Sequence, residues 1–346
     1  MPFKIFLMIF AFILGIIFNH FNKAKKNKNN DILYQITIAY LLFRIGFLGG
    51  GELITQQWQT IFFQSSVIIV ASSFWTLLVL TLLKRWSSFE AVTQISIATH
   101  FGSVSVGTFI AAIAFLDAMH IAIDSTVVIW LTIMEFPAII IGMWKLGVSA
   151  RSLLAIIKRK WALTILPISI ALGMLFSKAL PSTLSFVFFN QLFMPILLYF
   201  LFEMGCKASN NLLSLKKNVG SVLFTGIAIP ILGGIFGSSI GCLMGYSTGN
   251  IFIMAILMAS ASYVLAPLCM YEILKDIYKT KKEIAKEVVS TSMALSIGVT
   301  LPFNIAIGFE LYYMIIRALQ TWPILAFWGL GLPLLLGVLS MEYGKK

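Results

Sequence analysis

The sequence predicts an all-α polytopic membrane protein with inverted 5+5 transmembrane helix repeats, broken crossover helices and one extra C-terminal helix. Its composition is the first observation: 59% of the residues are hydrophobic and 11% are charged, too few charges to cover a soluble domain. The second is a series of apolar segments long enough to cross a bilayer. The third is that two of these segments are interrupted by small polar residues, a pattern typical of broken transmembrane helices.

Eleven apolar segments are long enough, or nearly so, to cross ~30 Å of hydrocarbon. The first resembles the hydrophobic region of a signal peptide. However, a basic cluster beginning at Lys23 follows it instead of a small-residue cleavage site, so we interpret it as a transmembrane helix. The predicted spans are 3–18, 32–50, 61–83, 89–116, 126–144, 161–176, 184–205, 219–244, 251–274, 288–316 and 322–341.

The basic residues predict how these spans are oriented. If the N-terminus is outside and the C-terminus is cytoplasmic, all but four of the 25 Lys and Arg residues fall in cytoplasmic loops. The exceptions are Lys4, Lys178, Arg317 and Arg44, the last of which lies within a span. The same rule explains the net charge of +12, so no nucleic-acid partner is expected.

The two interrupted segments share an unusual composition. One reads THFGSVSVGTF over 99–109, and the other reads MASASYVLAP over 258–267. Small hydroxyl residues at membrane depth have two explanations. They let helices approach closely, or they mark a broken helix whose backbone N–H groups face a ligand.

The first ten spans divide into two halves of five, and an odd number per half inverts the second half relative to the first. Short echoes occur in the same order in both halves. MEFPAIIIG at 134–142 of the first half matches TLPFNIAIG at 300–308 of the second. In the same way, HFGSVS corresponds to ASAS, and RIGFLGG corresponds more faintly to FEMGCKA. We therefore expect a first repeat over 1–145, a second over 161–317 and an additional helix over 322–341.

These motifs, in this order, resemble the sodium-dependent bicarbonate transporter family first known from cyanobacteria. The resemblance covers most of the chain. It implies a core domain and a gate domain, a homotrimer in the bacterial inner membrane, and uptake of bicarbonate with sodium. It also implies that the fourth and ninth spans break and cross near the midplane. A cytoplasmic regulatory protein is a further expected partner, although the long insert between the repeats of cyanobacterial members is replaced here by the short stretch 145–160.

Two half-helix N-termini suit a small oxyanion, because their free N–H groups and partial positive charge bind it without a buried arginine. The alternative is that these residues only pack helices closely. The predicted substrate-binding residues are Gly102, Ser103, Val104, Ser105, Ser260, Ala261 and Ser262.

The resemblance also implies a sodium site at the same place. Cyanobacterial members carry an acid where Tyr263 stands, and that acid helps to bind sodium. A phenol has no charge, so the sodium ligands here are expected to be backbone carbonyls freed by the helix breaks. The side chains predicted to contribute are Thr108, Glu135, Tyr263, Thr300 and Asn304, and no other metal site is expected.

Other polar groups within the spans have two interpretations each. Glu135 either couples transport to a cation or pairs with a structural partner. Arg44 and Glu203 are expected near cytoplasmic span ends, where they either reach the interface or form an ion pair that links the repeats. His100 is either a pH sensor or a packing residue. The three cysteines are dispersed, which argues against disulfides and against a metal site.

An enzyme is not expected, because the chain has three histidines, no nucleophile elbow and no phosphate-binding loop. Two alternatives to sodium-coupled bicarbonate uptake stay open. One is a sodium-independent permease or exchanger for another small carboxylate-like anion on the same fold. The other is a structural membrane subunit, which would leave the two interrupted segments unexplained.

Overall fold

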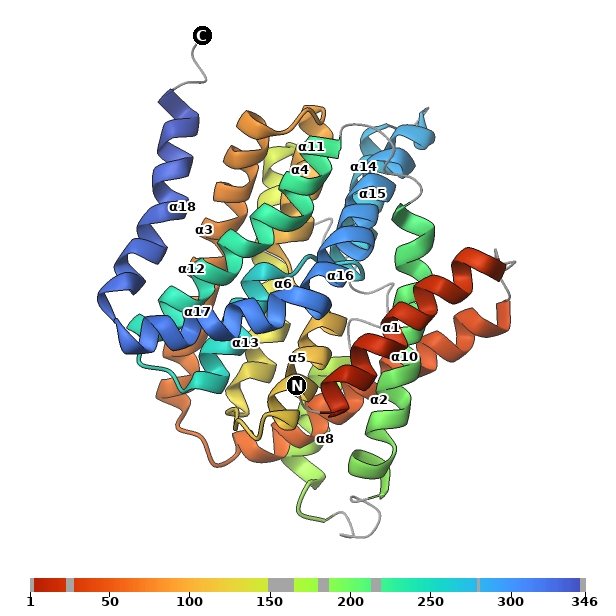
Figure 1. Cartoon of the computed structure of the whole chain (residues 1–346), viewed down its shortest axis with the longest axis vertical. Coiled ribbons are helices and arrows are strands. Elements are labelled where there is room, and N and C mark those ends of the chain that lie inside the picture. Colours follow the sequence, from red (N-terminus) through yellow and green to blue (C-terminus); the bar gives the residue numbers. More distant parts are fainter. Residues whose placement is uncertain are drawn as a thin grey trace.

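A computed structural model describes residues 3–22, 28–148, 165–179, 187–212, 219–278 and 281–342 of the chain. These residues form helices joined by short connections (Figure 1). Parts of two predicted spans, 161–164 and 184–186, lie outside the described residues.

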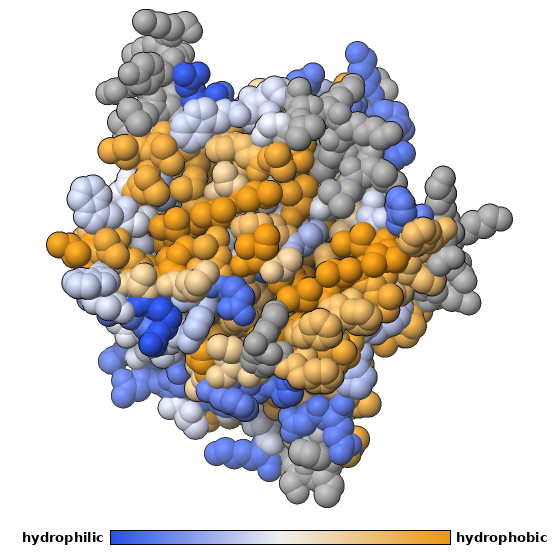
Figure 2. Space-filling view, in the orientation of Figure 1, coloured by the Kyte–Doolittle hydropathy of each residue, from blue (hydrophilic) through white to orange (hydrophobic). Residues whose placement is uncertain are grey.

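The helices reproduce the predicted membrane spans. Within the described ranges, eight helical stretches are long and apolar enough to cross a membrane. Three shorter apolar helices, Ile165–Phe176, Thr248–Ala259 and Ile324–Gly337, overlap the remaining predicted spans 161–176, 251–274 and 322–341. Large apolar side chains such as Phe62 and Trp328 are exposed, and Figure 2 shows a broad hydrophobic band across the visible face. This is the surface of a multi-pass membrane protein, because water would not stabilise such a band.

Four helices form one body, which we call the gate body. It consists of α1 (Phe3–Asn22), α2 (Lys28–Leu53), α8 (Ile165–Phe176) and α10 (Phe193–Leu212), which lie together in Figure 1. Helix α1 crosses α10, and α2 crosses α8.

Glycines set both crossings of the gate body. A Cβ atom on Gly15 of α1 would overlap the backbone of α10, and one on Gly205 of α10 would overlap the backbone of α1. In the same way, Gly50 of α2 lies against the α8 backbone and Gly173 of α8 against the α2 backbone. Backbones this close gain dispersion contacts, which drive helix association in lipid where the hydrophobic effect is absent.

The other helices form the core body, in which α18 is outermost. Its interior is aromatic: Trp75 stacks on Phe236 with ring centroids 5.6 Å apart, and Phe115 stacks on Phe252 at 5.2 Å. The helices of this body are α3 (Trp58–Trp86), α4 (Ala91–Gly102), α5 (Val106–Ala118), α6 (Thr126–Lys145), α11 (Val219–Leu223), α12 (Ile229–Leu243), α13 (Thr248–Ala259), α14 (Leu265–Ile277), α15 (Lys282–Leu295), α16 (Leu301–Phe303), α17 (Phe309–Thr321) and α18 (Ile324–Glu342).

Wider π-helical turns interrupt several long helices. They lie at Val187–Gln191, Phe224–Ala228, Ser296–Thr300 and Asn304–Gly308. The last two flank Pro302, whose missing N–H removes a hydrogen bond of the helix. The tenth span therefore continues from α15 to α17 over 282–321, longer than the predicted 288–316.

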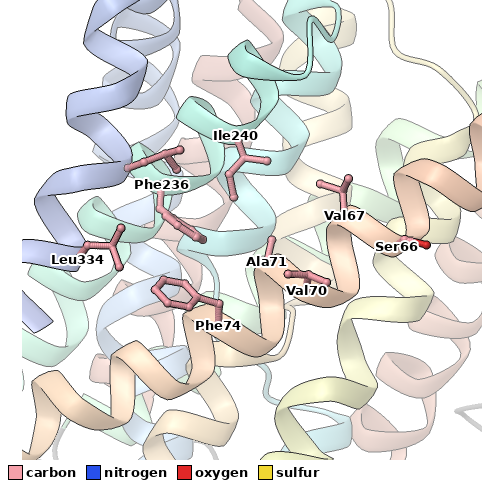
Figure 3. A pocket seen from close by; sticks show the side chains of 9 residues that line it. Ser66, Val67, Val70, Ala71, Phe74, Phe236, Ile240 and Leu334 are labelled. Carbon is pink, nitrogen blue, oxygen red and sulfur yellow. The ribbon is translucent and has the colours of Figure 1, made fainter.

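A groove of about 480 Å³ opens sideways between α3, α12 and α18 (Figure 3). Its lining is apolar apart from Ser66, and includes Val70, Phe74, Phe236 and Leu334. All three helices are predicted spans, so the groove faces lipid and offers no polar chemistry.

Substitution of Gly205 tests the glycine crossings. We expect Gly205→Val to destabilise the protein by about 1–3 kcal/mol, because its side chain would push α1 away from α10. The matched control is Gly331→Val on α18, where an added Cβ would meet no atom within 4 Å. Thermal unfolding in detergent measures both, and equal loss in the two variants would contradict close packing at Gly205.

Candidate functional site

Both interrupted segments are breaks in helices. Helix α4 ends at Gly102 and α5 begins at Val106, while α13 ends at Ala259 and α14 begins at Leu265. The predicted interruption of both segments is therefore confirmed. Neither break is exposed, since Ser103, Ser105, Ser260 and Ser262 all have at most 2% of their surface accessible.

The two breaks are hydrogen-bonded to each other. The Ser105 N–H donates to Ser260 Oγ at 3.0 Å, and the Ser262 N–H donates to the His100 carbonyl at 2.7 Å. Residues more than 150 positions apart thus share one site. Each bond satisfies an amide that the break has freed from its helix, as burial requires.

Serines of the breaks accept hydrogen bonds from amides in the first turns of the helices that follow. Ser105 Oγ accepts hydrogen bonds from the Thr108 N–H at 3.1 Å and the Thr108 hydroxyl at 2.7 Å. Ser262 Oγ accepts one from the Ala266 N–H at 3.3 Å. Ser105 is thus the N-cap of α5. Ser262 lies two residues before Val264, the N-cap position of α14, and binds an amide of the first turn.

Hydroxyl hydrogens divide the four serines into two pairs. Ser260 Oγ donates to the Leu257 carbonyl at 3.0 Å, and Ser103 Oγ donates to the Glu135 carbonyl at 3.5 Å. The hydroxyls of Ser105 and Ser262 accept the bonds described above and donate to no carbonyl in the described ranges, and the Ser105 hydroxyl also lies beside that of Tyr263. This second pair therefore has hydroxyl hydrogens that no carbonyl of the described residues engages.

The remaining predicted anion-site residues have no polar side chain. Val104 and Ala261 lie inside the breaks and are buried. A Cβ on Gly102 would overlap Oγ1 of Thr76 on α3. Gly102 therefore permits close packing of α4 on α3, so loss of function on enlarging it would not by itself indicate an anion site.

Tyr263 of the second break reaches the first. Its hydroxyl lies by the Ser105 side chain and against Gly107, where a Cβ would overlap it. Tyr263 is 7% exposed, and its hydroxyl makes no hydrogen bond of normal geometry within the described chain. Sequence reasoning missed Gly107, although it lies in the glycine-rich stretch that signalled the break.

Two predicted sodium residues hold buried carbonyls. Asn304 Nδ2 donates to the Ala259 carbonyl at 2.9 Å, and the Tyr312 hydroxyl donates to Asn304 Oδ1 at 3.0 Å. Asn304 thus lies at the end of α13, beside the second break. Thr300 instead donates to the Gly226 carbonyl at 3.1 Å, in a π-helical turn of a neighbouring span.

Thr108 and Glu135 approach the first break from two helices. Thr108 is 1% exposed and bonds to Ser105, as described above. Glu135 offers its backbone carbonyl to Ser103, while its carboxylate forms no ion pair with any described residue and interacts electrostatically with Cys269. Across the described ranges, no three His, Cys, Asp or Glu side chains form a metal-binding group.

The ion pair of Arg44 with Glu203, one of the two interpretations of these residues, is wrong, and so is the expectation that both lie at the same side of the membrane. Arg44 bonds to the Phe189 carbonyl and lines a cavity with Glu52 and Asp124. Glu203 accepts a hydrogen bond from Tyr199 at 3.2 Å and interacts electrostatically with Tyr34. Tyr34 precedes Arg44 by ten residues of helix, about 15 Å, so Arg44 lies toward the other end of α2.

A cavity of about 340 Å³ between α14 and α15 reaches the second break. Tyr263 and Pro267 line it near the break, and Ser290 and Lys286 line it toward the start of α15. It connects the crossing of the broken helices with the end of the bundle that carries Lys286.

Two broken helices that meet inside a bundle of membrane-spanning helices define a secondary transporter class, in which ligands bind where helices unwind. The sequence model of the Na+-dependent bicarbonate transporter superfamily matches residues 7–317, and the chain belongs to this family. Helix α18 lies beyond the matched residues. No curated protein matches the chain in a sequence comparison.

Substitution of Ser260 tests the bonds between the breaks. We expect Ser260→Ala to destabilise the protein by about 1–3 kcal/mol, because the buried Ser105 amide loses its acceptor. Ser66→Ala is the matched control, since Ser66 is half-buried and its hydroxyl donates only to the Phe62 carbonyl of its own helix among the described residues. The measurement is unfolding in detergent, and unchanged stability in Ser260→Ala would show that the crossing does not depend on this bond.

Proposed function

We propose that this chain takes up bicarbonate across the bacterial inner membrane, driven by sodium. The family supports sodium-dependent bicarbonate transport as the class of activity. The observation that carries the proposal is the crossing of the two breaks, where Ser105 and Ser262 lie within one hydrogen-bonded unit.

Bicarbonate binds, in this proposal, between the N-termini of α5 and α14. Both helices are 13 residues long and direct the positive ends of their dipoles at the breaks. Ser105 and Ser262 each add a hydroxyl donor. Gly102, Ser103, Val104, Ser260 and Ala261 complete the proposed site by shaping the backbone around the anion.

Sodium binds, in this proposal, to oxygens at the opposite helix ends. The C-termini of α4 and α13 carry partial negative charge, and their last carbonyls have no partner within their own helix. Thr108, Asn304 and Tyr263 lie at the breaks and supply neutral oxygens, and Thr300 is one turn of helix from Asn304. Glu135 supplies the carboxylate that Tyr263 lacks.

We further propose inverted repeats over 1–145 and 161–317, with 322–341 as an addition. The contacts between helices support these repeats, because the first helix of each repeat packs on the second helix of the other. Helix α1 packs on α10, and α8 packs on α2. Gly15 and Gly173, 158 residues apart, play equivalent parts in these crossings, as do Gly46 and Gly205, 159 apart. Such equivalence is expected of a two-fold axis in the membrane plane.

The surroundings of the protein follow from the same proposal. The N-terminus is outside and the C-terminus is cytoplasmic, so the cavity that ends at Lys286 opens to the cytoplasm. We propose a homotrimer in the lipid bilayer, with a cytoplasmic regulatory protein as a further partner, as the family resemblance implies.

One observation favours a second candidate function. Tyr263 is neutral where an acid helps to bind sodium in cyanobacterial members, which is compatible with a sodium-independent permease or exchanger for another small carboxylate-like anion. The proposed anion site would be the same.

Sodium dependence separates the two candidates. In proteoliposomes, we expect uptake of [14C]bicarbonate to require a sodium gradient and Glu135→Gln to weaken that requirement. The control is Glu90→Gln, because Glu90 caps α4 without a side-chain hydrogen bond. Wild-type uptake that ignores sodium would favour the alternative, and a normal sodium requirement in Glu135→Gln would remove Glu135 from the site.

The serines test the anion site. We expect Ser262→Ala to lose about 10-fold to 150-fold in bicarbonate affinity, the effect of removing ~1.5–3 kcal/mol of hydrogen bonding to a charged group. Ser105→Ala should behave similarly. Ser103→Ala is the matched control, since its hydroxyl hydrogen is engaged by the Glu135 carbonyl. If all three variants bind bicarbonate as tightly as the wild-type protein, bicarbonate binds elsewhere.

A further inference from the structure

A second polar cavity, of about 160 Å³, lies between the gate body and the core body. Arg44, Gly49 and Glu52 of α2 line one side, and Asp124 and Ser125, just before α6, line the other. It lies at the opposite end of α6 from Lys145, and so at the outer side in the proposed topology. The breaks do not line this cavity.

Arg44 is fixed in a way that leaves its outer nitrogens without a hydrogen-bond partner among the described residues. Its Nε donates to the Phe189 carbonyl, and its Cζ lies 3.9 Å from the centroid of the Phe193 ring. No described salt bridge includes Arg44. Asp117 acts on Arg44 electrostatically, but its carboxylate lies 3.4 Å from Lys4 Nζ and forms its ion pair there. A guanidinium in a transmembrane helix without an ion pair of its own is costly, which makes a functional role the first explanation.

Ser125 supplies a second unpaired donor from the core body. It is 5% exposed, lines the cavity, and its hydroxyl has no partner in the described chain. It also immediately precedes α6, a helix of 20 residues whose N-terminus carries partial positive charge. Hydrogen-bond donors thus come from both bodies.

Of the two carboxylates of the cavity, one is already engaged by an amide and the other is distant from Arg44. Asp124 is bound by Asn250 of α13, whose Oδ1 accepts its N–H at 2.9 Å and whose Nδ2 donates to its carboxylate. Glu52 is exposed and lies eight residues beyond Arg44 on α2, about 12 Å along the helix. A cation near Arg44 would meet a guanidinium and a helix N-terminus, so the donors favour an anion.

We propose that Arg44, Ser125 and the N-terminus of α6 form an outer binding site for a small monovalent oxyanion. The inference rests on the proposed function, in which that anion is bicarbonate on its way to the breaks. Because its donors belong to two bodies, the site is complete only while those bodies stay in this arrangement.

The KM for bicarbonate tests the site, because removing a positive charge and removing a negative charge should change it in opposite directions. We expect Arg44→Gln to raise the KM for bicarbonate by about 10-fold to 150-fold with little change in maximal rate, as loss of a charged donor predicts. Arg44→Lys should restore part of the affinity. Glu52→Gln should lower the KM, because it removes a negative charge from the path of the anion. Monodispersity in detergent confirms that each variant folds.

A binding measurement separates this inference from the proposed function. The measurement uses Ser262→Ala protein, in which anion binding at the breaks is expected to be weakened. Sodium bicarbonate should raise the Tm of this protein above its value in sodium chloride. It should not raise the Tm of the Arg44→Gln, Ser262→Ala double variant. If wild-type protein fails to transport bicarbonate but this shift requires Arg44, the proposed function fails and the outer site stands. Unchanged KM and unchanged shift in the Arg44→Gln variants would overturn the inference. The inference would also be overturned if Glu52→Gln raised the KM for sodium while Arg44→Gln left the KM for bicarbonate unchanged.

Discussion

The structure depends on two hydrogen bonds that join the broken helices: Ser262 N–H to the His100 carbonyl, and Ser105 N–H to Ser260 Oγ. A broken helix at membrane depth is stable only if the protein itself satisfies the freed backbone groups, because lipid offers no partners. Placing the breaks against each other meets this requirement. Small side chains at both breaks follow from it, since the two backbones must approach closely.

The gate and core bodies are held by different interactions. Glycines let backbones touch in the gate body, and stacked aromatic rings fill the core body. At the seam between them, Phe200 of α10 approaches Gly107, and Val128 of α6 approaches Gly49. The seam also contains Arg44 and Ser125.

Hydrogen-bond direction decides which residues of the breaks are available to a ligand. Ser260 and Ser103 donate their hydroxyl hydrogens to carbonyls, while the oxygens of Ser105 and Ser262 accept from amides in the first turns of α5 and α14. The sequence shows four equivalent serines. Their different roles come from contacts with helices remote in the chain, so no local pattern predicts them.

The sequence by itself determined the helical spans, the two breaks and the family resemblance, because hydropathy and small-residue clusters are local properties of the chain. Tertiary structure decided the rest. It placed Tyr263 in a notch at Gly107, set Gly102 against Thr76, and separated Arg44 from Glu203. The physical reason is that local composition fixes where a helix forms and ends. Which helices meet depends instead on packing between segments more than 100 residues apart.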